Sequence, residues 1–180
     1  MTTATTPTTS TTPTTSTTPT TALVLIDLMP RLISLPVAPN TGEEVLDRSR
    51  NLATAFRAAG RPVVLIRVDR PNVAEQPPGS GFAEDLVRPG DVTLVKGSVG
   101  AFATTELDAR LKDLGVDTLV FGGLMTNMGV ESTARVAADL GYELEFAADA
   151  MSALTAEEHE FAVRVTFPRF GTVTAVADYL

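Results

Sequence analysis

The sequence predicts an α/β protein in which helices cover both faces of a parallel, Rossmann-like β-sheet. Three observations support this fold class. Five short apolar runs recur along the chain, longer amphipathic segments separate them, and polar residues or glycines stand where several runs end. Strands and helices that alternate this often are typical of parallel sheets, because each helix carries the chain back across the sheet.

The five apolar runs have the length of β-strands. Those at 22–27, 62–69 and 117–123 are apolar almost throughout, which is the pattern of strands buried on both faces. The runs at 92–96 and 143–149 contain more polar residues but occupy equivalent places in the alternation. We therefore expect these five segments to be strands of one sheet.

Four segments have apolar residues at helical spacing and form the predicted helices. They cover 42–60, 104–115, 128–141 and 155–167. Gly60 and Gly115 stand where helix-ending glycines are common, and Thr104 or Thr105 could cap the start of the second helix. In a sheet built this way, ligands bind beyond the carboxyl ends of the strands.

Length and charge limit the classes of protein that fit. A chain of 180 residues and 19.0 kDa suits one domain with a substantial core. The formal charge of -8 disfavours a general nucleic-acid-binding protein, and no apolar run approaches the roughly 20 residues that span a bilayer. We expect no nucleic acid and no membrane among its partners.

The N-terminus differs sharply in composition from the rest of the chain. Residues 1–21 are mostly Thr, Pro and Ser, and such a segment cannot bury enough apolar surface to offset the entropy lost on ordering. We predict a disordered tail over 1–21 and a single domain over 22–180. Thr/Pro-rich tails can be glycosylated in secreted proteins, but no secretory signal precedes this one, so a cytoplasmic location is expected.

The absence of cysteine excludes several kinds of site. The chain can form no disulfide, thiolate metal site or cysteine nucleophile. Its one histidine, His159, stands among acidic residues in the last predicted helix, and we expect it on a solvated helix face. A multi-histidine catalytic metal site is excluded, and we expect no cofactor or metal.

Three chemically notable features stand at the ends of predicted strands. Asp27 ends the first run, Lys96 ends the third run in a "VKGS" segment, and a glycine-containing turn with Gly129 follows the run at 117–123. If these strands are neighbours, a carboxylate, an ammonium and a helix N-terminus meet at one edge of the sheet. A carboxylate and ammonium partly removed from water can act as general acid or base. The alternative is structural, with Asp27 capping a turn and Lys96 solvated.

Three segments in order resemble the isochorismatase-like hydrolases, also called the cysteine hydrolase superfamily. They are "ALVLIDLMPRL", "LVKGSVGAFATTELDARLKDLGVDTLVFGG" and "LMTNMGVESTARVAADLGYELEFAADAMSA". The resemblance covers residues 22 to about 170. It implies a six-stranded parallel sheet in a three-layer arrangement, a small-molecule substrate, and assembly into a homodimer or larger homo-oligomer.

Most members of this superfamily hydrolyse amides with an Asp, Lys and Cys triad. By position Asp27 matches the carboxylate and Lys96 the lysine, whereas Gly129 stands where the nucleophilic cysteine belongs. The thioester route is therefore closed to this chain. The resemblance also implies a cis peptide bond near Met125. Two departures from the family pattern are Met29 in place of a frequent Gln and the missing metal pattern after Asp69.

Relatives without the cysteine cleave vinyl ethers, which need no protein nucleophile. The resemblance thus implies that Asp27 protonates the vinyl carbon of a substrate such as isochorismate while Lys96 orients it, and that Gly129 leaves space for the substrate. Two alternatives stay open. The same pair could promote hydrolysis, hydration, dehydration or cyclisation of another metabolite in a biosynthetic pathway, or the protein could bind a ligand without turning it over.

The remaining candidate substrate-binding residues come from the same segments. Arg67 is the preferred cation for an acidic substrate, ahead of Arg31 and Arg70, although an edge or subunit salt bridge would also explain it. The other candidates line the loops and turn around the proposed pair, and they are Ser98, Phe102, Met125, Thr126 and Met128. No histidine that could act as a base lies near Ser98 or Thr126 in the sequence, so a hydroxyl nucleophile is discounted.

Overall fold

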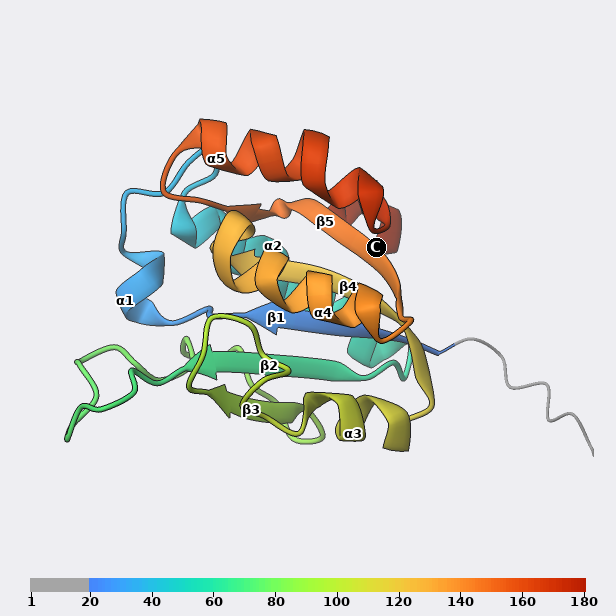
Figure 1. Ribbon diagram of the computed structural model, residues 1–180, viewed down its shortest axis with the longest axis horizontal. Helices are drawn as coiled ribbons and strands as arrows, with labels where there is room; N and C mark the ends of the chain where they lie inside the picture. The colour runs from blue at the N-terminus through green and yellow to red at the C-terminus, as the bar shows by residue number, and fades with distance from the viewer. Residues whose placement is uncertain (1–19) are drawn as a thin grey trace, which may run out of the picture.

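The computed structural model describes residues 20–180 (Figure 1). The first strand begins at Thr20, so the last two residues of the expected tail belong to the sheet. The remainder of the expected tail lies outside the described residues. Within residues 20–180 no helix is both long and apolar enough to cross a membrane.

Six parallel strands form one sheet in the order β3-β2-β1-β4-β5-β6. Their bounds are β1 Thr20–Ile26, β2 Val63–Val68, β3 Val92–Lys96, β4 Val116–Leu124, β5 Glu143–Ser152 and β6 Thr172–Thr174. The five strands expected from the apolar runs are all present. β6 has only three residues, too few to give an apolar pattern, and its presence agrees with the six strands that the family resemblance implies.

Helices lie on both faces of this sheet, in three layers. Their bounds are α1 Pro30–Ile33, α2 Gly42–Ala58, α3 Leu107–Asp113, α4 Glu131–Asp139 and α5 Ala156–Phe161, with π-helical turns η1 Thr126–Val130 and η2 Ala162–Thr166 and 3-10 turns η3 Phe167–Arg169 and η4 Val176–Tyr179. In Figure 1, α4 lies in front of the sheet and α2 behind it. The predicted fold class is confirmed.

β1 shows how one strand supports two cores. Ala22, Val24 and Ile26 point into the core shared with α3 and α4, and Leu23 and Leu25 point into the core shared with α2. All five are at most 1% exposed. Each fully buried aliphatic side chain contributes about 1.5–3 kcal/mol relative to its exposed state. The continuous apolar run is therefore explained by burial on both faces.

The helix ends refine the sequence expectations. α2 begins after a capping box in which Thr41 and Glu44 bond reciprocally, and Thr155 and Glu158 form the same motif before α5. The helix expected over 104–115 starts later, at Leu107, whose backbone N–H donates to a threonine hydroxyl. The helix expected over 128–141 begins as the wider turn η1, which spacing alone does not distinguish from an α-helix.

Candidate active site

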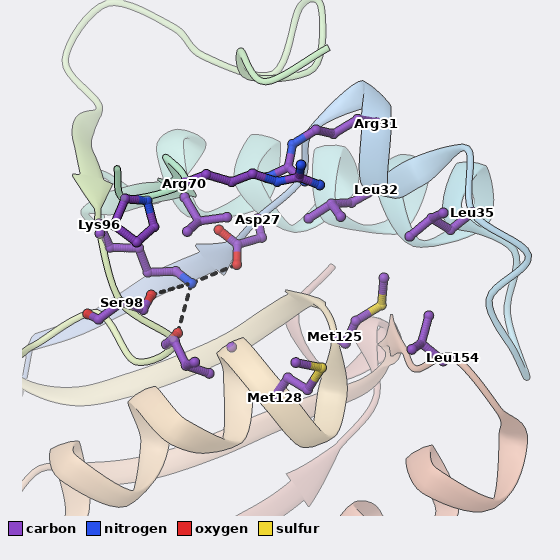
Figure 2. A pocket seen from close by; sticks show the side chains of 15 residues that line it. Asp27, Arg31, Leu32, Leu35, Arg70, Lys96, Ser98, Met125, Met128 and Leu154 are labelled. Carbon is purple, nitrogen blue, oxygen red and sulfur yellow. Dashed lines mark hydrogen bonds and ion pairs between the residues drawn. The ribbon is translucent and has the colours of Figure 1, made fainter. Parts of the chain in front are cut away.

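A buried ion pair lies at the carboxyl edge of the sheet. Lys96 Nζ is 2.7 Å from Asp27 Oδ2, and the two residues are 2% and 5% exposed. β2 lies between β1 and β3, so the two strands that end at this pair are not neighbours in the sheet. The long lysine side chain instead reaches across the end of β2 to meet the carboxylate (Figure 2).

The backbone around each member fixes its side chain. Asp27 has a φ of 54°, a left-handed conformation that Asp tolerates better than most residues, and its N–H donates to the Ile66 carbonyl. Lys96 Nζ also donates to the carbonyls of Ser98 and Val99, at 3.3 and 2.8 Å. The three donors of the ammonium are thus matched by three acceptors, which holds it in one place.

Burial raises the pKa of the Asp27 carboxyl, against the lowering effects of Lys96 and, more weakly, Arg31. Asp27 Oδ1 is buried and has no hydrogen-bond partner among the described residues, whereas Oδ2 contacts Lys96. The free oxygen can therefore carry a proton while the other still accepts a hydrogen bond from the Lys96 ammonium. This is the arrangement that a carboxyl group needs to act as a general acid.

Gly129 lies in η1 directly against this carboxylate. A Cβ built there would be 3.0 Å from Asp27 Oδ2 and 3.0 Å from Ile26 Cγ2. Its φ is not in the left-handed region, so the backbone does not require glycine. The position requires the absence of a side chain, because the carboxylate occupies the adjacent space. The peptide bond between Leu124 and Met125, just before this turn, is cis.

The pair lines a cavity of about 430 Å³. Four more of the sequence-predicted site residues line it, and they are Ser98, Met125, Met128 and Gly129. The Ser98 hydroxyl is engaged elsewhere, with the Gly100 carbonyl at 2.7 Å and the Thr104 hydroxyl at 2.8 Å. Ser98 therefore shapes the loop and accepts a bond from Lys96 through its carbonyl.

Arg67 lies outside this cavity. Its guanidinium pairs with Asp69, donates to the Ser80 carbonyl and stands 5.9 Å from the centre of the Phe82 ring. These contacts give it a structural role in holding the segment after β2. We therefore no longer assign it to substrate binding.

Phe102 also lies away from the cavity. Its ring is 6.3 Å from that of Tyr142, and it packs against the core under α3 and α4. The loop after Lys96 turns this side chain toward the core, in accord with the alternative of a core aromatic.

Thr126 is fully buried and forms a 2.8 Å hydrogen bond with Nδ1 of His159. The expectation that His159 faces solvent is wrong, since it is 6% exposed, and burial lowers its pKa. The sequence contained an indication of this burial, because His159, Ala162 and Thr166 recur at helical spacing and form one buried side of the helical segment. Neither Thr126 nor His159 lines the cavity, so the pair ties α5 to the turn that carries Gly129.

The two arginines that line the cavity are those ranked behind Arg67 in the sequence, and several of its apolar residues were not among the predicted site residues. Arg31 on α1 and Arg70 after β2 line it, together with Leu32, Leu35 and Leu154. Arg31 and Arg70 follow predicted strand ends, which was the available signal. Among residues 20–180 no group of three or more His, Asp or Glu residues could hold a metal ion.

Comparison with known proteins agrees with this geometry. A family model described as the isochorismatase domain matches residues 21–178. The uncharacterized isochorismatase family protein YecD of Escherichia coli O157:H7 is 38% identical over 176 residues, covering 88% of this chain and 94% of that protein. Streptothricin hydrolase of Streptomyces noursei is 34% identical over 133 residues, covering 72% of this chain and 48% of that enzyme.

A solved structure extends the likeness to three dimensions. An isochorismatase family protein from Burkholderia thailandensis superposes with a TM-score of 0.82 at 36% identity, covering 90% of this chain and 94% of that one. The residues that the family model matches, 21–178, include all of the sheet except the first residue of β1, and they include the turn that carries Gly129. The chain belongs to the isochorismatase family of hydrolases.

Proposed function

We propose that this protein is a cysteine-independent hydrolase in which Asp27 is the general acid, with a vinyl ether such as isochorismate as its substrate. The observation that carries the proposal is the Asp27–Lys96 pair, buried beside Gly129 at the inner end of the cavity. The chain contains no cysteine, so the reaction must proceed without a thiolate nucleophile.

Vinyl ether hydrolysis matches what a buried, protonated carboxyl can do. Asp27 Oδ1 transfers its proton to the terminal vinyl carbon, and the ether oxygen stabilises the resulting oxocarbenium ion. Water adds to that cation and returns a proton to the carboxylate, and the hemiketal then collapses to pyruvate and an alcohol. Lys96 stabilises the carboxylate that forms after proton transfer. General acid–base catalysis of this kind contributes about 10²–10⁴-fold to the rate.

The direct test follows pyruvate release from isochorismate by the purified full-length protein. Asp27→Asn should lower the rate by at least about 10²-fold. Asp85→Asn is a matched control, because Asp85 also has a positive φ, of 59°, but is an exposed surface carboxylate. Absence of pyruvate release by the wild-type protein from both isochorismate and the simpler enol ether 2-phenoxyprop-2-enoate, or full turnover by Asp27→Asn, would reject the proposal.

A second candidate is hydrolysis of another small metabolite with Asp27 acting as a base toward water. It is favoured by the likeness to streptothricin hydrolase. The two candidates predict opposite pH profiles. A general acid needs protonated Asp27, so the rate falls as pH rises through the raised pKa; a general base gives a rate that rises over the same range. Ligand binding without turnover of any substrate would instead indicate a non-catalytic relative.

A further inference from the structure

Two arginines of the cavity have no ion-pair partner in the described part of the chain. Arg31 extends from α1 and Arg70 from the segment after β2, and both side chains reach over the cavity above Asp27 (Figure 2). Arg31 Nε is buried and has no hydrogen-bond partner within residues 20–180. By contrast, Arg57 and Arg67 bind carboxylates and carbonyl oxygens.

The charge of the cavity lining is unbalanced. Its titratable side chains are one carboxylate and three cations, although the whole chain has a formal charge of -8. Lys96 lies 2.7 Å from Asp27 and neutralises it, and Arg31 acts on Asp27 only through its field, without an ion-pair contact. Two guanidinium groups thus remain available, and their planar N–H donors suit bidentate binding of a carboxylate.

The other side chains of the cavity offer almost no polar partner. Eight apolar residues line it, among them Leu32, Leu35, Val99, Met125, Met128 and Leu154. Four of these are unusually exposed for apolar side chains, at 38–53%, so a bound molecule would cover them. The one hydroxyl, on Ser98, is already bonded within its loop.

We propose that Arg31 and Arg70 bind a single carboxylate and that the substrate carries it on an otherwise apolar body, which packs on the leucine and methionine side chains. This rests on the proposed function for the reaction itself and narrows the substrate to an enol ether of pyruvate with an apolar alcohol part, in place of isochorismate, whose alcohol part carries a second carboxylate and a hydroxyl. In such a molecule the carboxylate is bonded to the ether carbon, adjacent to the carbon that Asp27 protonates. The substrate carboxylate must therefore lie beside cations that are close to Asp27.

Equilibrium binding of phenoxyacetate tests the proposal, because this aryl ether has one carboxylate and no vinyl group to react. We expect the full-length protein to bind phenoxyacetate at least about tenfold more tightly than the neutral phenoxyacetamide or than succinate, which lacks the aromatic ring. Affinities are measured by calorimetry at fixed ionic strength. Arg31→Gln and Arg70→Gln should each weaken phenoxyacetate about tenfold and leave phenoxyacetamide unchanged. Unchanged amide binding also shows that each variant is folded.

Arg164→Gln is the matched control, since Arg164 is an exposed surface arginine on η2. The proposal would be overturned if the protein bound phenoxyacetate and phenoxyacetamide equally, bound succinate more tightly than phenoxyacetate, or did not bind phenoxyacetate. It would also be overturned if the double Arg31→Gln, Arg70→Gln variant bound phenoxyacetate as tightly as the wild-type protein.

The outcomes also separate this inference from the proposed reaction. Asp27→Asn should keep its affinity for phenoxyacetate while losing turnover of 2-phenoxyprop-2-enoate, which would be hydrolysed to pyruvate and phenol. Arginine-dependent binding without pyruvate release rejects the reaction alone. Pyruvate release that is insensitive to both arginine substitutions rejects the substrate class alone.

Discussion

Gly129→Ala should disable the acid while leaving the fold intact. The new Cβ would lie 3.0 Å from Asp27 Oδ2 and from Ile26 Cγ2, closer than ordinary van der Waals contact, so the carboxylate must move by a few tenths of an ångström. Overpacking of this kind costs about 1–3 kcal/mol, and replacing glycine by alanine in a helical turn returns about 1 kcal/mol. We therefore expect a net destabilisation of about 0–2 kcal/mol.

The effect on catalysis should be larger than the effect on stability. Misplacement of a catalytic group by about 1 Å can cost about 10²-fold, so a shift of a few tenths of an ångström should lower turnover by about tenfold. The assay is pyruvate release together with a carbon NMR titration of the Asp27 carboxyl, which needs no substrate. Gly81→Ala is the control, because a Cβ there meets nothing within 4 Å. Wild-type turnover and an unchanged Asp27 titration in Gly129→Ala would refute this reasoning.

Three further predictions follow from the same contacts. Arg31→Gln should shift the alkaline limb of the pH–rate profile to higher pH, because Arg31 lowers the pKa of Asp27; an unmoved or lower limb would contradict this. Lys96→Met should destabilise the protein more at pH 8 than at pH 5 in urea unfolding. Burial raises the pKa of Asp27 in the folded state, so the folded protein loses stability as pH rises through that pKa and the carboxyl ionises without its ammonium partner. Equal losses at the two pH values would contradict the burial argument. Thr126→Val should cost about 1–3 kcal/mol in thermal unfolding by leaving His159 Nδ1 unpaired, and a double-mutant cycle with His159→Phe should recover much of that cost.

The strands and the ion pair could be predicted because both have a recognisable local pattern in the sequence. An apolar run that stops at Asp27 or Lys96 marks a strand end, and parallel strands bring such ends to one edge. The family resemblance added the sixth strand and the meaning of Gly129. What the sequence did not contain was the order of the strands, so the reach of Lys96 across β2 appeared only in three dimensions.

The choice among the arginines failed for a different reason. Arg67 follows four consecutive buried residues of β2, but its partners are Asp69 and the segment that holds Ser80, whose path follows no periodic pattern. Arg31 lies on a four-residue helix too short to be recognised by spacing. The location of a cation relative to a cavity depends on such loops, and loop paths are set by tertiary contacts rather than by local preference.

The contact between Gly129 and Asp27 bears on the expectation that Gly129 stands where most of the superfamily has its cysteine. A cysteine at position 129 would need its Cβ within 3.0 Å of Asp27 Oδ2, so a nucleophile could be restored only if the carboxylate moved. The glycine and the ion pair thus form one packed unit, in which the Asp27 carboxyl occupies the space that a side chain at position 129 would need. Since Asp27 Oδ1 remains unpaired and Asp27 lines a cavity with two free arginines, this unit retains the parts needed for proton transfer to a bound anion. That combination favours an acid–base enzyme over a non-catalytic relative, because a binding protein needs neither a buried ammonium nor an unpaired buried carboxyl oxygen.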